Sequence, residues 1–322
     1  MKPTIGITMG DPTGVGPEII LKTVSNKKIK KICRIVILGD EAVLKYQDSR
    51  FKTQDSRYSI INLSVLNPEK LRPGKPAKAC SRAAMSYIEK AVEMALKGDI
   101  DAIVTAPINK DAINRAGYNF HGHTEYLAHL THTKDYVMML AGKSLKVSLV
   151  TIHEAIKDIP GLLKTKDVLK TIRITNDSLK AYFGIKNPRI AVAALNPHAG
   201  ERGLFGDEEK NIILPAVKKA MALGIDVSPP LPSDTVFYRT VVKKEFDAVV
   251  CMYHDQGLIP LKLLHFKDGV NITLGLPIIR TSVDHGTAYD IAWKGIANPQ
   301  SMTAAIETAV EMVKARKTGA GG

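Results

Sequence analysis

Three histidines, each placed shortly after an apolar segment, form the arrangement in this sequence most able to do chemistry. They are His153 after residues 147–152, His198 after residues 190–195 and His254 after residues 249–253. If the segments are parallel strands, their carboxyl ends bring the three side chains to one edge of a sheet, where ligands of α/β proteins bind. Neutral imidazole binds borderline divalent ions, and three ligands leave coordination positions for a substrate. Taken alone, each histidine is more often a hydrogen-bonded structural residue, but the shared position favours a metal site.

A second group of residues has the composition of a phosphate site. Lys262, Asn271 and Arg280 follow one another at nine-residue intervals. Arginine binds phosphate in bidentate fashion and lysine binds it as a point charge. Because surface cations often have such spacings, the pattern alone is a weak signal. It predicts three contacts to an anionic substrate.

The other histidines of one segment form a rival metal cluster on paper. They are His121, His123, His129 and His132. Residues 122–125 instead resemble a helix start, whose hydroxyl group and exposed backbone donors suit an anion. Residues 131–134 are typical of a solvated turn. We therefore predict substrate contacts for His123 and Thr124.

The elements that must position these side chains alternate between short apolar strands and longer amphipathic helices. The predicted strands are residues 4–9, 32–38, 102–105, 146–151, 189–194 and 248–252. Helical spacing predicts a helix over 81–96, closed at Gly98, and a weaker one over 209–223, which Pro215 either kinks or begins. Continuous apolar strands indicate a sheet covered by helices on both faces. The predicted fold class is α/β, with mostly parallel strands in α/β/α layers.

A short-chain dehydrogenase pattern also occurs in the chain. Its components are Gly10, Gly14, Gly16, Asp40, Tyr182 and Lys186. Gly184 and the pair at 187–188 predict that a helix ends between the tyrosine and the lysine, so these two cannot share one helical face. Prolines within the glycine segment make it a rigid turn, which weakens the dinucleotide interpretation.

Length and composition limit the class of protein. The 322 residues, 45% of them hydrophobic, can bury a large core and favour two lobes with a cleft. The formal charge of +13 suits anionic substrates. We expect no nucleic-acid partner, because the lysine pairs lack interleaved aromatic residues. Neither a signal peptide nor a membrane-spanning run is visible, and the spacing of Cys33, Cys80 and Cys251 indicates the reducing cytoplasm.

Long motifs extend over nearly the whole chain. They occupy residues 6–18, 105–110, 122–125, 195–201, 232–235, 252–257, 269–273 and 280–287. Together they resemble the 4-hydroxythreonine-4-phosphate dehydrogenase family of pyridoxal phosphate biosynthesis, including the related 4-phospho-D-threonate and 4-phospho-D-erythronate dehydrogenases. The resemblance implies a homodimer with an isocitrate/isopropylmalate dehydrogenase-like fold and an active site completed by the partner subunit. We place the two domains at 1–130 with 275–322 and at 131–274, with a cleft between them.

The resemblance also implies roles for the residues singled out above. The family's metal positions match His153, His198 and His254. Its substrate contacts match His123, Thr124, Lys262, Asn271 and Arg280. The predicted catalytic residues are Lys262, Asp234 and Asp255, where each aspartate is either a proton acceptor or the partner that orients a histidine.

The implied reaction is the NAD-dependent oxidation of 4-phosphooxy-L-threonine at C3, followed by decarboxylation to 3-amino-2-oxopropyl phosphate. A divalent ion (zinc, cobalt, nickel, manganese or magnesium) lowers the pKa of the hydroxyl group and later polarises the new ketone. The residues that contact NAD have no fingerprint in this sequence. Their expected region is Gly10, Gly14 and Gly16 together with residues 284–289, which offer small and polar groups.

Three alternatives stay open. The related branch that oxidises 4-phospho-D-threonate or 4-phospho-D-erythronate uses the same metal and phosphate residues, and segments 259–261 and 289–291 differ from the biosynthetic pattern. A phosphotransacetylase-like acyltransferase resembles the same fold and also holds phosphate, but it needs no metal. The third alternative is a basic binding protein without catalysis.

Overall fold

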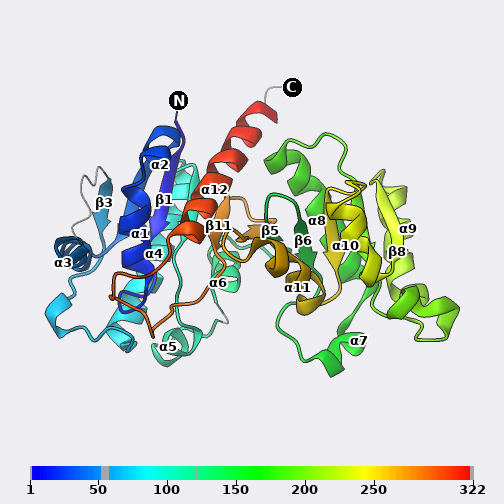
Figure 1. Ribbon diagram of the computed structural model, residues 1–322, viewed down its shortest axis with the longest axis horizontal. Helices are drawn as coiled ribbons and strands as arrows, with labels where there is room; N and C mark the ends of the chain where they lie inside the picture. The colour runs from blue at the N-terminus through cyan, green and yellow to red at the C-terminus, as the bar shows by residue number, and fades with distance from the viewer. Residues whose placement is uncertain (1, 52–57, 121, 320–322) are drawn as a thin grey trace. The chain divides into compact units, whose positions relative to one another are not determined.

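The structure is a computed structural model that describes residues 2–51, 58–120 and 122–319. The chain divides into two compact units, whose elements are labelled in Figure 1. Unit 1 comprises Met1–Lys134 with Leu276–Lys314, and unit 2 comprises Asp135–Gly275 with Ala315–Gly322. Both units combine helices with mostly parallel strands, so the predicted α/β class is confirmed.

The five strands of unit 1 run parallel to one another. In spatial order they are β3 (Ser59–Asn62), β2 (Arg34–Gly39), β1 (Thr4–Thr8), β4 (Ala102–Thr105) and β11 (Arg280–Val283). The helices are α1 (Gly16–Val24), α2 (Lys27–Ile32), α3 (Glu41–Phe51), α4 (Lys78–Lys97), α5 (Lys110–Arg115), α6 (His123–Leu130) and α12 (Gln300–Gly319), with a short turn η1 (Pro68–Lys70). The last turn of α12, from Ala315, is counted with unit 2. Helix α4 packs on β1, β2 and β4, and it ends as predicted at Gly98, whose φ is 80°.

Unit 2 contains six strands, of which β5 is antiparallel to both of its neighbours. In spatial order they are β10 (Val270–Leu274), β5 (Val137–Ala141), β6 (Lys146–Leu149), β9 (Ala248–Cys251), β7 (Ile190–Ala193) and β8 (Val227–Leu231). The helices are α7 (Ile159–Leu162), α8 (Thr165–Phe183), α9 (Leu214–Ala222), α10 (Ser233–Val241) and α11 (His254–His265). Three short turns, η2 (Ile156–Asp158), η3 (Pro197–Gly203) and η4 (Glu209–Ile213), complete the unit.

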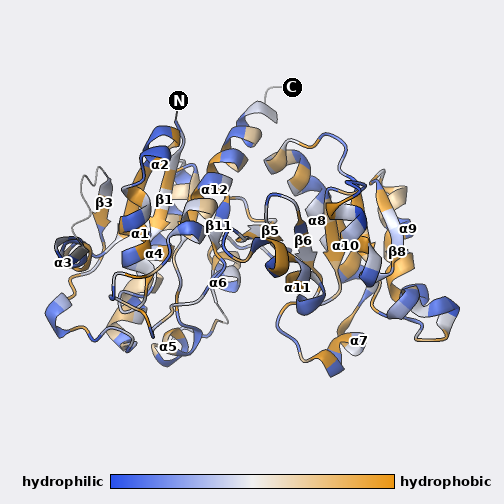
Figure 2. Ribbon diagram, viewed as in Figure 1, coloured by the Kyte–Doolittle hydropathy of each residue, from blue (hydrophilic) through white to orange (hydrophobic). Residues whose placement is uncertain are grey.

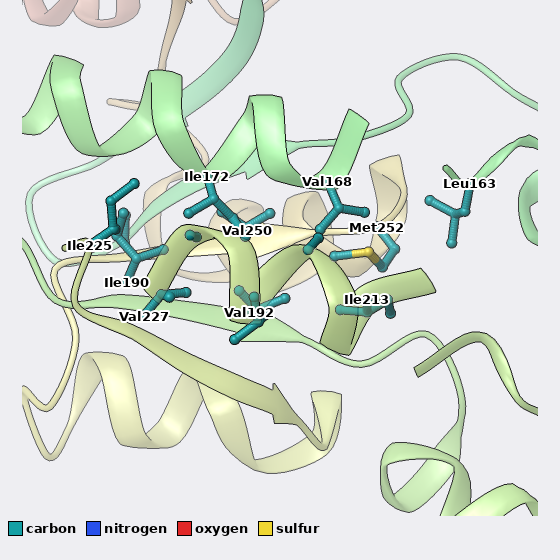
Figure 3. Close-up of a cluster of buried hydrophobic side chains, with 14 of the residues drawn as sticks. Leu163, Val168, Ile172, Ile190, Val192, Ile213, Ile225, Val227, Val250 and Met252 are labelled. Carbon is teal, nitrogen blue, oxygen red and sulfur yellow. The ribbon is translucent and has the colours of Figure 1, made fainter. Parts of the chain in front are cut away.

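Strands β5, β7 and β9 of unit 2 are buried along their whole length. In β7, Ile190 and Val192 belong to one hydrophobic cluster, while Ala191 and Ala193 belong to another. Figure 3 shows the first cluster, in which side chains of α8 such as Ile172 lie over the strands. In Figure 2, helices such as α10 and α12 alternate between hydrophobic and hydrophilic residues along their length. This pattern is the one expected for helices that cover a sheet with one face only.

All six predicted strands are present, but five strands were not predicted. They are β3, β5, β8, β10 and β11. Strand β8 contains Pro229 and Pro230, and prolines normally weigh against a strand. Because β8 lies at the end of the strand order, the side that faces away from β7 needs no hydrogen-bond partner. Strands β10 and β11 fall in the stretch that the sequence indicated only as a phosphate site.

Two helix boundaries match the expectations from proline and glycine. Helix α8 ends at Phe183 with Gly184 in the left-handed conformation, so Tyr182 and Lys186 do not share a helix. Pro215 lies in the first turn of α9, which makes it a helix start, and Glu209–Ile213 before it forms a separate π-helical turn. No helix within the described residues is long and apolar enough to cross a membrane.

Candidate functional site

Three neighbouring parallel strands of unit 2 end at the three predicted metal-binding histidines. Strand β9 pairs in parallel with β6 on one side and with β7 on the other. His153 follows β6, His254 follows β9 and His198 follows β7. The topology that the metal hypothesis requires is therefore present at this edge of the sheet.

The structure brings two of the three imidazole rings together. The ring centroids of His153 and His254 are 5.7 Å apart, with an angle of 38° between the ring planes. The ring of His198 lies 6.3 Å from that of Phe205. Within the described ranges, no three histidine, cysteine, aspartate or glutamate side chains are close enough together to hold a metal ion. Of the three predicted ligands, His153 and His254 are therefore the two whose rings lie near each other.

A carboxylate orients the ring of His254. His254 is the first residue of α11, and its Nδ1 lies 2.7 Å from Oδ1 of the exposed Asp255. Carboxylate partners of this kind set the tautomer and orientation of metal-binding histidines, and they leave Nε2 for the ion. Of the two roles predicted for Asp255, this contact supports orientation. Asp234 is exposed in the first turn of α10.

A glutamine that sequence reasoning missed ties the ends of β7 and β9 together. The side-chain oxygen of Gln256 accepts a hydrogen bond from the backbone N–H of Met252 at 2.6 Å. Its Nε2 donates to the backbone oxygen of Ala194 at 2.6 Å and to Oγ of Ser233 at 2.8 Å. Because Gln256 is 7% exposed, its amide has few water partners. Its place two residues after His254 was the only signal in the sequence.

His198 lies in a left-handed turn. Residues 198–202 have φ between 42° and 78°, and only Gly200 among them lacks a Cβ atom. Each non-glycine residue in this conformation costs roughly 1–2 kcal/mol, so the surrounding structure must hold the turn. Just before the turn, the buried carboxylate of Glu209 accepts hydrogen bonds from the backbone N–H groups of Leu195 and Asn196 at 2.8 and 2.7 Å.

The nine-residue series of predicted phosphate contacts falls on three different elements. Lys262 lies in α11 with its ammonium group 5.6 Å from the ring centroid of Phe266. Asn271 lies in β10, and its Oδ1 is among the buried polar atoms of the described residues that have no hydrogen-bond partner. These two residues belong to unit 2, whereas Arg280 lies in β11 of unit 1.

Arg280 is a buried cation in the core of unit 1. It is 2% exposed, and its Nη2 donates a hydrogen bond to Oγ1 of Thr105 at 2.7 Å. Burial lowers the pKa of the guanidinium group to about 9, so it stays charged at neutral pH. A buried cation close enough to His123 to affect its pKa supports the interpretation of Arg280 as a contact for an anionic ligand.

His123 and Thr124 begin helix α6 in unit 1. Burial, and then the positive charge of Arg280, hold the pKa of His123 well below its usual value, so the ring is neutral. The Nε2 atom of His123 is buried and has no hydrogen-bond partner among the described residues. An unsatisfied buried nitrogen beside a buried cation is an arrangement typical of binding sites for polar ligands.

The glycine turn and the segment predicted to lie near NAD contact each other. The backbone N–H of Val15 donates to the oxygen of Thr287 at 3.0 Å. Tyr289 donates to Oδ2 of the buried Asp11 at 2.6 Å, and burial together with this hydrogen bond raises the pKa of Tyr289. Gly10 has a φ of 69°, and a Cβ atom there would lie 2.4 Å from the oxygen of Pro107. The two predicted cofactor segments therefore form one local structure.

The remaining features of the dehydrogenase pattern and of the rival cluster have structural roles. The Asp40 carboxylate is buried and accepts hydrogen bonds from the N–H groups of Val43 and Leu66, so it caps α3 and cannot serve a ribose. His129 packs against Phe120 with ring centroids 5.2 Å apart. His132 lies in a turn with a φ of 53°. His121 lies outside the described residues.

Comparisons with known proteins extend over nearly the whole chain. A family model described as pyridoxal phosphate biosynthetic protein PdxA matches residues 23–309. A 4-hydroxythreonine-4-phosphate dehydrogenase from Desulforapulum autotrophicum is 51% identical over 99% of this chain and 97% of the relative. A D-threonate 4-phosphate dehydrogenase from Salmonella typhimurium is 46% identical over 96% of this chain and 98% of the relative.

A solved structure shows the same fold. The chain of 4-hydroxythreonine-4-phosphate dehydrogenase from Klebsiella pneumoniae has a TM-score of 0.89 with this chain at 42% identity. The match covers 97% of this chain and 98% of that chain. The likeness therefore extends over nearly the whole of this chain.

Proposed function

Because the chain belongs to the family of the pyridoxal phosphate biosynthetic protein PdxA, a family of dehydrogenases, we propose that it oxidises 4-phosphooxy-L-threonine at C3 with NAD. Decarboxylation of the product then gives 3-amino-2-oxopropyl phosphate. The observation that carries the proposal is the place of His153, His198 and His254 after three neighbouring parallel strands. The proposed enzyme is a cytoplasmic homodimer whose active site is completed by the partner subunit.

We propose that a divalent ion, one of zinc, cobalt, nickel, manganese or magnesium, is held by these three histidines. The paired rings of His153 and His254 and the carboxylate of Asp255 at Nδ1 of His254 fit such an ion, because they provide imidazole ligands with an orienting partner. When bound, the ion supplies a Lewis acid for the hydroxyl oxygen of the substrate. The ring of His198 must move next to the rings of His153 and His254 before all three histidines can bind one ion.

The proposed substrate contacts hold the phosphate and the acid group away from the reacting carbon. Arg280, buried and charged, offers its guanidinium group to an oxyanion, and neutral His123 offers an unsatisfied nitrogen. Thr124 adds a hydroxyl group at the start of α6, while Lys262 and Asn271 add a cation and an amide. Fixing the phosphate places C3 reproducibly against the nicotinamide ring, which is the main contribution a protein makes to hydride transfer.

The proton of the C3 hydroxyl group requires an acceptor, for which Lys262, Asp234 and Asp255 are the proposed catalytic residues. The contact of Asp255 with His254 supports an orienting role for that aspartate. Asp234 is then left as the carboxylate able to accept the proton, whereas Lys262 contributes its positive charge. Substituting each in turn and comparing the pH dependence of turnover distinguishes an acceptor from an orienting group.

A second substrate has specific support. The relative named D-threonate 4-phosphate dehydrogenase is 46% identical to this chain, close to the 51% of the biosynthetic relative. Oxidation of 4-phospho-D-threonate or 4-phospho-D-erythronate at C3 uses the same phosphate and metal contacts. The acyltransferase alternative has less support, because the relatives compared above are named dehydrogenases.

The test measures NADH formation by the purified full-length chain with each substrate in turn. We expect turnover of 4-phosphooxy-L-threonine to exceed that of 4-phospho-D-threonate and to be lost after treatment with a chelator. Restoring one metal at a time identifies the ion. Higher activity on the threonate replaces the proposed substrate, and activity that resists the chelator contradicts the metal.

A further inference from the structure

We propose that Thr105 is a positioning residue that holds the guanidinium group of Arg280 in the direction needed to bind an anionic group of the substrate. This role rests on the proposed function, because Arg280 is taken as a contact for that group. Thr105 itself does not have to touch the substrate. The role involves residues of unit 1 alone, and it needs neither the metal ion nor NAD.

The side chain of Arg280 extends along the sheet toward the carboxyl ends of the strands. Arg280 lies opposite Ile103 of the parallel strand β4, but its Nη2 donates a hydrogen bond at 2.7 Å to Oγ1 of Thr105, two residues further along β4. Strand β4 ends at Thr105. Because ligands of α/β proteins bind at the carboxyl ends of parallel strands, Thr105 holds the guanidinium group at the edge where an anion would bind.

The guanidinium group lies on the face of the sheet that is turned away from α12. Successive side chains of a strand point to opposite faces. Thr281, the residue after Arg280, donates its hydroxyl group to the backbone oxygen of Ala305, so α12 covers the other face. Burial, and then the charge of Arg280, lower the pKa of His123. Arg280 is therefore held beside Thr105 and near the neutral ring of His123.

A buried threonine at the end of a strand is well suited to hold a cation in place. Its branched Cβ atom restricts rotation of the side chain, so the backbone of β4 sets the direction of Oγ1. Thr105 and Arg280 are both buried, so few water molecules can replace the hydroxyl oxygen as an acceptor. Loss of the hydroxyl group would leave a charged donor without this acceptor and would let the guanidinium group turn.

Thr8 provides a matched control. It lies opposite Thr105 in the parallel pairing of β1 with β4, so the two side chains point to the same face at the same level of the sheet. Both threonines are buried, but Oγ1 of Thr8 has no hydrogen-bond partner among the described residues. Valine has nearly the shape of threonine, so Thr105→Val and Thr8→Val change packing to a similar extent. The first variant also removes the hydrogen bond to Arg280.

The experiment measures the binding of inorganic phosphate to the full-length protein, without substrate or NAD, from the rise of the thermal unfolding midpoint with phosphate concentration. Sodium chloride at equal ionic strength corrects for screening. We expect Thr105→Val to bind phosphate about 10-fold more weakly than the wild type, as for the loss of a hydrogen bond to a charged group. Thr105→Ser, which keeps the hydroxyl group, and Thr8→Val should both stay within about 3-fold of the wild type.

Steady-state kinetics with the phosphorylated substrate provide a second measurement. The KM of Thr105→Val should rise about 10-fold while kcat stays within about 3-fold of the wild type, because the anion is held away from the reacting carbon. Thr105→Ser should restore most of the KM. A purely structural role of Thr105 would lower the unfolding midpoint without changing KM or the response to phosphate.

The outcomes separate the role of Thr105 from the proposed function. Wild-type phosphate affinity in Thr105→Val, with a loss in Arg280→Ala, overturns the role of Thr105 and leaves the anion contact intact. Wild-type affinity in Arg280→Ala, or no phosphate binding by the wild type, overturns both. An equal loss in Thr8→Val also overturns the role, because packing would then explain the effect. If Thr105→Val fails to fold by circular dichroism, Thr105→Ala takes its place, and an unchanged phosphate affinity there counts against the role of Thr105.

Discussion

The two units hold their proposed site residues in different ways. In unit 1, Arg280 is a core residue of β11, 2% exposed and hydrogen-bonded to Thr105 of the neighbouring strand β4. In unit 2, His198 and His254 lie just beyond the strands. Glu209 and Gln256 hydrogen-bond to the backbone near the strand ends, and Asp255 contacts the ring of His254. The cation of the proposed site in unit 1 therefore lies within the folded core, whereas the histidines of the proposed site in unit 2 lie beyond the ends of the core strands.

Because of this difference, we expect substitutions in the two units to affect stability and activity differently. A change at a residue in a turn alters one ligand and little packing, whereas a change at a buried cation alters the core as well. Substituting a histidine ligand of the proposed metal site should therefore lower activity with little loss of stability, whereas substituting the buried Arg280 of the proposed anion site should lower both. Each prediction below tests one side of this contrast.

The largest expected effect is that of His198→Ala on turnover. Losing a metal ligand should lower kcat by a factor on the order of 1000, which corresponds to about 4 kcal/mol of transition-state stabilisation. The free energy of unfolding should hardly change, because the ring lies in an exposed turn. Steady-state kinetics and urea unfolding measure the two quantities. His132→Asn is the matched control, and a comparable loss of turnover there would favour the rival histidine cluster instead.

Arg280→Ala should affect both quantities. Removing the buried side chain leaves a cavity, which costs about 2–4 kcal/mol of unfolding free energy. The KM for the phosphorylated substrate should rise about 10- to 100-fold, since a hydrogen bond to a charged group contributes about 1.5–3 kcal/mol. Arg280→Lys, which keeps the charge but loses the planar fork, separates the two effects. Normal stability of Arg280→Ala would remove the contrast between the units.

The contrast also explains how much of the site could be predicted from the sequence. The strand-end positions of His153, His198 and His254 follow from apolar runs, which are local signals, and the structure has β6, β7 and β9 where they were expected. The burial of Arg280 depends on β11, a strand of four residues that local pattern did not indicate. The spacing of Lys262, Asn271 and Arg280 indicated residue types suited to phosphate. It did not indicate that the three residues lie on different secondary-structure elements.

Supporting residues were the hardest to predict. Gln256 hydrogen-bonds to the backbone of Ala194, 62 residues earlier in the chain, and Glu209 to the backbone of Leu195, 14 residues earlier. Nothing in residue type or spacing reveals such a bond before the strands are paired. The ligands of a site are therefore easier to find in a sequence than the residues that hold them.

Gln256→Ala tests whether the strand ends of unit 2 need their support. The substitution leaves the buried N–H of Met252 and the oxygen of Ala194 without this partner, which should cost about 2–3 kcal/mol of unfolding free energy. Turnover should fall as well, because His254 lies between Met252 and Gln256. Urea unfolding measures the first effect, with Gln300→Ala, an exposed glutamine, as the control. A variant that loses turnover alone would show that Gln256 acts only on the site.

The pH dependence of stability should have a contribution from His123 in unit 1. Its pKa is lowered in the folded state, so the unfolded chain binds its proton more readily. The stability that this group contributes is complete above the unfolded pKa of about 6.5, declines as the pH falls below it, and is fully lost once the pH has passed through the folded pKa. The slope should not exceed about 1.4 kcal/mol per pH unit. Between pH 7 and 5, the urea unfolding midpoint of His123→Gln should depend less on pH than that of the wild type. The same pH dependence in both proteins would contradict a neutral His123 ring.

The smallest effect is expected at Tyr182, a residue of unit 2 that belongs to neither proposed site. In a short-chain dehydrogenase the tyrosine donates a proton and shares a helical face with a lysine four residues later, but here α8 ends at Phe183 and Gly184 has a φ of 67°. Tyr182→Phe should therefore leave kcat and KM unchanged within error. The same assay that shows the loss in His198→Ala provides the comparison. A large fall in kcat at Tyr182 would mean that hydride transfer is supported by a third region, and the division of roles between the two units would fail.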